Sequence, residues 1–201
     1  MKKKMKEHMV DTVPFFRGFA VSADLLGAGM LLMSDYGSVE GALRINLKDR
    51  YFPVFEAGYA ECDKADAGTH VSYKTQAPYG RIGIDFNLLK NKHDIYRLYA
   101  GVRYAYTRYQ FDIASPAVKD PVWGDNVDFS TQGVDAYCHW AEVVFSADAS
   151  IWGPLHLGWS VRYRNRLVSN EGELGKSWYV PGYGKSGKSN FGGTFNVIID
   201  I

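Results

Sequence analysis

The chain lacks any long hydrophobic run. Its longest uninterrupted apolar stretch runs from Leu25 to Met33, well short of the roughly 20 residues that a membrane-spanning helix needs. An excess of either charge is lacking too, because 23 Lys and Arg residues face 22 Asp and Glu residues, which leaves a formal net charge of +1. This balance excludes a strongly charged nucleic-acid binder, and 46% hydrophobic residues over 201 positions exclude a disordered tail. The length suits one ordinary domain.

Cysteine is scarce, and the common metal-binding motifs are missing. Two cysteines are too few for a disulfide scaffold or for a structural zinc site. The sequence contains no HExxH, no pair of CxxC motifs and no oxygen-rich calcium loop. We therefore expect no metal site and no cofactor.

Alternation of apolar and polar residues recurs along the chain instead. In the clearest case, residues 81–88, apolar side chains at 82, 84, 86 and 88 alternate with arginine, glycine, aspartate and asparagine. Successive side chains of a strand point to opposite faces, so such a block predicts a strand with one apolar face. We expect eight strands, at residues 16–26, 37–47, 51–62, 79–89, 95–112, 137–152, 155–167 and 191–201.

The connections between these strands alternate in length. Those at 48–50, 90–94 and 153–154 are short, whereas those at 27–36, 63–78, 113–136 and 168–190 are long. Outer-membrane β-barrels show this pattern, with an even strand number, short periplasmic turns and long outer loops. We therefore predict an all-β fold: an eight-stranded antiparallel up-and-down transmembrane β-barrel over residues 15–201, in the bacterial outer membrane.

A basic tail, residues 1–14, precedes the predicted barrel. It begins MKKKMK, but the apolar segment of a signal peptide does not follow, so the chain as written shows no export signal. If the short turns are periplasmic, this tail is expected to be periplasmic too.

The placement of cations helps to separate a membrane barrel from a soluble one. A soluble barrel of the lipocalin kind also alternates, but its apolar face turns inward and its polar face meets water. Every lysine falls in the tail, the turns or the loops as drawn above, while the cations within the strands are arginines. Planar arginines paired with carboxylates suit a crowded polar interior. This pattern favours a barrel surrounded by outer-membrane lipid.

The polar faces of the predicted strands carry arginines and carboxylates in matching numbers. We expect a charge network inside the lumen, formed by Glu40, Arg44, Glu56, Arg81, Asp85, Arg97, Arg103, Glu142, Asp148, Arg162 and Arg164. Eight strands leave an interior just wide enough for side chains to fill, so we interpret the network as a structural plug. A gated proton or ion path is the functional alternative.

Aromatic residues gather towards both ends of the predicted strands, where amphipathic rings prefer the headgroup level. On the turn side they are Phe16, Tyr51, Phe52, Tyr96 and Trp152, and on the loop side Tyr106, Tyr109, Tyr137, Trp140 and Phe191. A soluble β-domain also uses such rings for cross-strand packing, which stays the alternative.

This strand number and loop asymmetry resemble the small eight-stranded outer-membrane barrels, such as the families of outer membrane proteins A and X. The likeness covers Phe15 to Ile201 as architecture and involves no shared motif. The chain looks most like small outer-membrane barrels without an assigned function.

The two cysteines lie on the loop side of this barrel. Cys62 ends the third predicted strand and Cys138 opens the sixth, with the fourth and fifth strands between them. That separation is too large for rigid strands at the usual disulfide Cα distance of about 4.4 to 6.8 Å. A disulfide formed through bent loop ends and a pair of free thiols both stay open.

Two short motifs could carry chemistry. His70 and Ser72 form a pair of the hydrolase kind, but without a matched carboxylate we interpret them as part of an exposed polar loop. The glycine-rich run from Pro181 to Lys188 could cradle a phosphate. Because no helical pattern follows it, we predict a flexible basic loop there.

We expect a non-enzymatic barrel whose long loops or outer wall bind another protein or a surface molecule. One alternative is an accessory subunit docked on a larger outer-membrane barrel, such as the barrel-assembly machinery. Others are an enzyme that modifies outer-membrane lipid and a soluble lipocalin-like ligand carrier. No nucleic-acid partner is expected.

Overall fold

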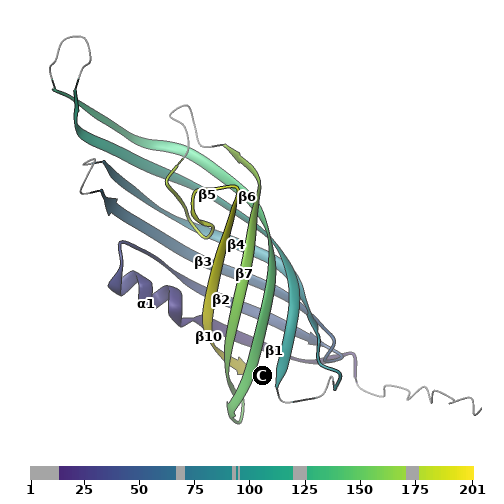
Figure 1. Cartoon of the computed structure of the whole chain (residues 1–201). Helices are drawn as coiled ribbons and strands as arrows, with labels where there is room; N and C mark the ends of the chain where they lie inside the picture. The colour runs from purple at the N-terminus through teal and green to yellow at the C-terminus, as the bar shows by residue number, and fades with distance from the viewer. Residues whose placement is uncertain (1–13, 67–70, 92–93, 95, 120–125, 171–176) are drawn as a thin grey trace, which may run out of the picture.

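Eight strands close into one antiparallel barrel in the computed structural model (Figure 1). The structure describes residues 14–66, 71–91, 94, 96–119, 126–170 and 177–201; the predicted tail lies almost wholly outside them. The wall strands are β1 (Phe16–Asp24), β2 (Tyr36–Leu47), β3 (Tyr51–Ala65), β4 (Ser72–Asn87), β5 (Arg97–Lys119), β6 (Asn126–Trp152), β7 (Leu155–Asn170) and β10 (Ser189–Asp200). Each pairs with its neighbours in chain order, and β10 returns to β1. The predicted eight-stranded up-and-down barrel is confirmed.

A tight turn joins β2 to β3 at the short-loop end. Lys48 and Asp49 have φ values of 57° and 54°, as a two-residue hairpin turn requires, and Arg50 N donates to Leu47 O at 3.1 Å. Asn46 braces the turn, since its side chain donates to Asp49 Oδ1 at 2.7 Å and accepts from Asp49 N at 2.8 Å. The turn fixes the register of the two strands.

A helix, α1 (Leu25–Met33), replaces the first predicted long loop, so that prediction is wrong. Asp24 caps the helix, because its carboxylate accepts from the backbone N–H groups of Leu26 at 3.0 Å and Gly27 at 3.1 Å. The helix lies against β2, where a Cβ on Gly37 would stand 2.4 Å from Leu31 N. It is almost uniformly apolar, so no helical period marked it in the sequence. The described part of the chain contains no helix long and apolar enough to span a membrane.

The strands around the next two loops are longer than predicted. β3 and β4 extend to Ala65 and Ser72, and β5 and β6 extend to Lys119 and Asn126. The extensions lie in segments predicted as loops, whose many Gly, Asp, Ser, Lys and Pro residues are typical of loops. The hairpin of β5 and β6 projects farthest, at the end opposite the C-terminus (Figure 1).

The last predicted loop contains a small hairpin, formed by β8 (Tyr179–Val180) and β9 (Gly184–Lys185). Tyr179, Val180 and Tyr183 are 5%, 0% and 0% exposed and belong to the core of the barrel. We call residues 177–187 the plug. The prediction of a flexible basic loop over 181–188 is therefore wrong.

Candidate functional site

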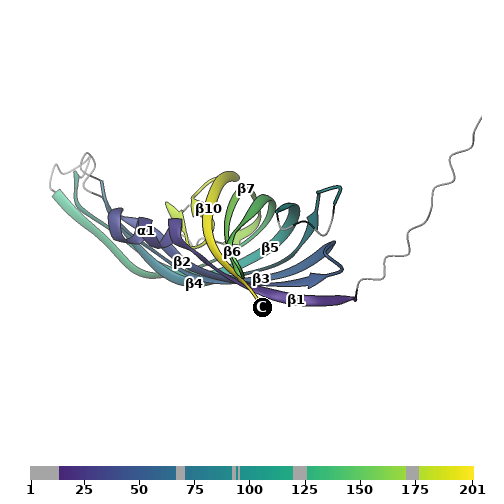
Figure 2. The same cartoon turned by 90° about the horizontal axis from the view of Figure 1, so that it is seen from below.

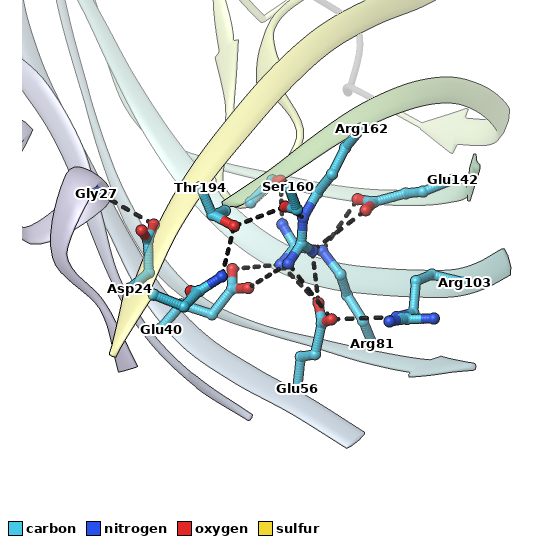
Figure 3. A network of polar contacts seen from close by, with 12 residues as sticks. Asp24, Gly27, Glu40, Glu56, Arg81, Arg103, Glu142, Ser160, Arg162 and Thr194 are labelled. Carbon is cyan, nitrogen blue, oxygen red and sulfur yellow. Dashed lines mark hydrogen bonds and ion pairs between the residues drawn. The ribbon is translucent and has the colours of Figure 1, made fainter. Parts of the chain in front are cut away.

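The centre of the lumen is a network of buried charges (Figure 3). Glu56, on β3, lies among three guanidinium groups: Arg162 Nη1 donates to it at 2.6 Å, Arg103 Nε donates at 3.1 Å, and Arg81 Nη1 lies at 3.3 Å. All four side chains are at most 5% exposed. Burying a charge is unfavourable unless it is paired, and here each charge meets its opposite.

Two further carboxylates complete this centre. Arg81 pairs with Glu40 and, at 3.0 Å, with Glu142. Arg162 reaches the same two carboxylates at 3.2 and 3.5 Å. With Arg103 on β5, the network therefore ties the six strands from β2 to β7 together across the lumen.

The network continues towards the turn end. Arg103 meets Asp85 at 2.8 Å, and Arg44 meets Asp148 at 2.5 Å. A cavity of about 20 Å³ between these groups has room for about one water molecule, and a second cavity of about 180 Å³ lies on the turn side, between Arg44 and Arg97.

The structure places all the side chains predicted for the network in the lumen. All except Arg97 pair with one another, and Arg97 pairs with Asp200 at 3.2 Å. Sequence reasoning missed Tyr79, whose hydroxyl donates to Glu40 at 2.7 Å, and Trp140, whose Nε1 donates to Glu142 at 2.6 Å. The only signal for both was strand parity, which puts them on the same face as their charged neighbours.

The plug covers the network from the loop side. Arg81 donates to Gly182 O and Arg164 donates to Tyr183 O, both at 2.8 Å. Gly182 has a φ of 77° and lies on the ring of Tyr79, where a Cβ would come within 2.4 Å of ring carbon, so only glycine fits. The segment presents carbonyl oxygens to arginines here, which is the reverse of a phosphate cradle.

An apolar core surrounds the plug in the loop-side half of the lumen. It includes Tyr73, Phe111 and both cysteines. Tyr73 donates its hydroxyl to Tyr179 O at 2.7 Å, which fastens the plug to β4. Cys62 and Cys138 are free thiols with no exposed surface, so the structure contains no disulfide between these two strands. Burial raises the pKa of Cys62 to about 11.

Three of the predicted interfacial aromatics face the lumen. Phe52, Tyr109 and Trp140 are at most 2% exposed, because each occupies an inward position of its strand. That part of the prediction is wrong. The other seven rings point outward and are 37% to 82% exposed.

The outer wall carries an apolar band, which extends from the turns to a polar boundary on the loop side. Val39, Phe55, Ile82, Val102 and Phe145 are 46% to 56% exposed on five wall strands. Farther towards the loops, β3 to β6 carry exposed charged pairs: Asp63 pairs with Lys74 at 3.0 Å, and Arg108 faces Asp135 at 3.8 Å. Lys64 and Lys74 thus lie on strands, contrary to the predicted loops, but beyond the apolar band.

The proposed hydrolase pair gains no support from its surroundings. His70 lies outside the described residues, and the hydroxyl of Ser72 donates to Ala114 O at 3.3 Å, between β4 and β5. Among the described residues, no cluster of three or more His, Cys, Asp and Glu side chains could hold a metal ion.

Comparisons with known proteins give one structure and one family. The crystal structure of Neisserial surface protein A (NspA) matches with a TM-score of 0.47 and 14% sequence identity, over 92% of this chain and 99% of that chain. No curated protein sequence matches. Residues 1–200 match the family described as "Domain of unknown function (DUF6048)". The chain therefore belongs to this family of unknown function.

Proposed function

We propose that the protein is a non-enzymatic, non-conducting outer-membrane β-barrel that binds another protein through its loop-side hairpin. The distribution of side chains supports the membrane location, since charges fill the interior and apolar groups cover the exterior. A soluble carrier would have the opposite arrangement. On β3, the stretch from Tyr51 to Ala60 suits the roughly 9 to 11 residues of a tilted spanning strand.

The filled lumen argues against a channel. The charge network leaves room for about one water molecule, and the plug packs above it. An ion would have to displace arginine–carboxylate pairs that hold six strands together. We therefore prefer to interpret the charge network as a structural filling of the lumen and not as an ion path.

The geometry of the β5–β6 hairpin is the observation that supports the proposed binding of another protein. Pairing of β5 with β4 ends at Ala114 opposite Ser72, and pairing of β6 with β7 ends at Tyr137 opposite Asn170. Beyond these points the two strands have, among the described residues, only each other as strand partners, out to Lys119 opposite Asn126. Both outer edges of this ribbon present main-chain donors and acceptors to which another strand can add.

The partner class that we propose is a larger outer-membrane barrel. Such a protein lies in the same membrane and carries its own loops at the height of the hairpin. The docked accessory subunit is thus the more specific form of this proposal.

A hairpin truncation tests the function. Replacing residues 115–129 with an Asn-Gly turn joins the partners Ala114 and Ser130, removes most of the ribbon and leaves the paired wall intact. We expect both proteins to enter the outer-membrane fraction, to show heat-modifiable migration and to form no channels in planar bilayers. Only the full-length chain should crosslink to a larger outer-membrane protein. Equal crosslinking by the truncated chain would contradict the role of the hairpin, and a chain that is soluble and monomeric without detergent would contradict the location.

A further inference from the structure

The strand pairing of the wall is interrupted on the loop side of Asp24. β1 and β10 pair only from Ala20 opposite Asp200 to Asp24 opposite Asn196. β10 continues to Ser189, where its described partner is β7 alone, and β2 continues towards the loops with β3 as its described partner. Helix α1 lies beside this interruption (Figure 1, Figure 2).

A cleft of about 400 Å³ opens at this interruption. Its apolar side is formed by Leu26 and Met30 of α1 together with Tyr36 and Phe191. Leu26 is 46% exposed and Phe191 is 73% exposed, so apolar surface continues from the cleft to the outer wall. An extended hydrocarbon chain fits such a surface.

The inner side of the same cleft is cationic. Arg81, Arg164 and Lys185 line it. Two carboxylates also line it: Asp24 caps α1, and Glu40 pairs with Arg81, so the charges of this pair cancel and the lining keeps one positive charge in excess. Lys185 is exposed and lies 5.7 Å from the ring of Trp178, so its ammonium group can meet a ligand at the mouth of the cleft. This charge distribution favours an anionic group next to the apolar wall.

The cleft lies at the level where lipid acyl chains meet their headgroups. Phe191 packs on the exposed ring of Tyr163 at 5.0 Å, and both belong to the outward aromatics near the polar boundary.

We propose that this cleft binds a phosphate-bearing lipid of the outer leaflet. One acyl chain lies along Met30 and Phe191, and the phosphate lies between Lys185 and Arg164. This inference rests on the proposed outer-membrane location, because only there does the cleft open towards lipid.

Native mass spectrometry of the full chain, folded in a neutral detergent, tests the proposal. Dilauroyl phosphatidic acid is the probe, and phosphatidylcholine with the same acyl chains is its comparison. We expect one phosphatidic acid to bind at least about tenfold more tightly than phosphatidylcholine, as a charge-assisted contact predicts. Lys185→Gln should weaken binding about tenfold, whereas Lys188→Gln, an exposed lysine of the same segment outside the cleft, should not change it. Met30→Asp should abolish binding.

Each outcome decides one question. Equal affinity for the two lipids, equal effects of the two lysine variants, or displacement of the lipid by inorganic phosphate would overturn the proposal. Heat-modifiable migration of each preparation shows whether the variants fold. If Met30→Asp does not fold, Lys185→Gln still tests the proposal, because the side chain of Lys185 is exposed. A folded barrel in the outer-membrane fraction that does not distinguish the lipids refutes the cleft and leaves the proposed function standing.

Discussion

Replacing Glu56 with glutamine probes whether the lumen is dry. The substitution keeps the shape of the side chain but removes one negative charge from a position that three arginines share. Each arginine retains another carboxylate: Arg103 keeps Asp85, while Arg81 and Arg162 keep Glu40 and Glu142. The variant therefore leaves one unmatched positive charge among groups that stay hydrogen-bonded.

The expected loss of unfolding free energy follows from the dielectric environment. Two charges about 4 Å apart attract by about 4 kcal/mol at an effective dielectric constant of 20, and by about 1 kcal/mol in water. Breaking a buried ion pair costs about 3 to 5 kcal/mol. Because the three arginines keep other partners, we expect Glu56→Gln to lower the free energy of unfolding by about 3 kcal/mol.

Denaturant unfolding in lipid vesicles, followed by heat-modifiable migration, measures this value. Asp63→Asn is the matched control, since it removes a carboxylate from an exposed pair with Lys74 and should change stability by at most about 0.5 kcal/mol. Removing Arg103 in the Glu56→Gln background should cost less than the sum of the two single changes, because it restores neutrality. Equal stability of Glu56→Gln and Asp63→Asn would contradict the hypothesis that the lumen excludes water and would favour the alternative of an ion path.

Three further predictions concern the helix, the plug and the thiols. Gly37→Val forces side-chain atoms against the backbone of α1 and should lower the free energy of unfolding by about 1 to 3 kcal/mol, whereas Gly29→Ala, with no atom within 4 Å of its new Cβ, should not; similar denaturation midpoints would contradict this contact. Tyr73→Phe removes the 2.7 Å bond to the plug and should cost about 1 kcal/mol and speed proteolysis there, so unchanged cleavage would count against the plug. Cys62 and Cys138 should resist iodoacetamide in the folded protein and both react after heat unfolding, with or without reductant. Since burial raises the pKa of Cys62 to about 11, the reactive thiolate stays a small minority at both pH 7 and pH 9, and labelling should be slow at both; fast labelling of the folded chain would contradict its burial.

The wall of the barrel was predictable because a strand has a period of two. Residues 81–88 show inward and outward positions directly, and the short turns marked one end of the barrel. The extensions of β5 and β6 were not predictable in the same way, because they lie in a segment whose many Gly, Asp, Ser, Lys and Pro residues are typical of a loop. Helix α1 was missed for the opposite reason, since nearly every residue in it is apolar.

The charge network was predictable for a related reason. Arginine and carboxylate on the inward parity of neighbouring strands have to meet when the wall closes, and Arg81 and Glu56 do so. The plug was not predictable, since its contacts depend on where a loop folds back. Its hydrogen bonds use main-chain oxygens of Gly182 and Tyr183, and no side-chain pattern encodes them. Only the glycine at 182, with its positive φ and the ring of Tyr79 against it, left a trace in the sequence.

The charge network and the plug fill the lumen together, and each depends on the other. Arginines alone could hold the turn-side half, but their outer hydrogen-bond donors would then meet water at the loop side. The plug supplies carbonyl oxygens to Arg81 and Arg164. Its Tyr183 packs against the ring of Trp140, and Nε1 of Trp140 in turn donates a hydrogen bond to Glu142 of the network. Opening a path through this arrangement would expose both the charges and the apolar core at once. This arrangement supports the proposal of a closed barrel, for which the β5–β6 hairpin and the cleft beside α1 are the proposed binding surfaces.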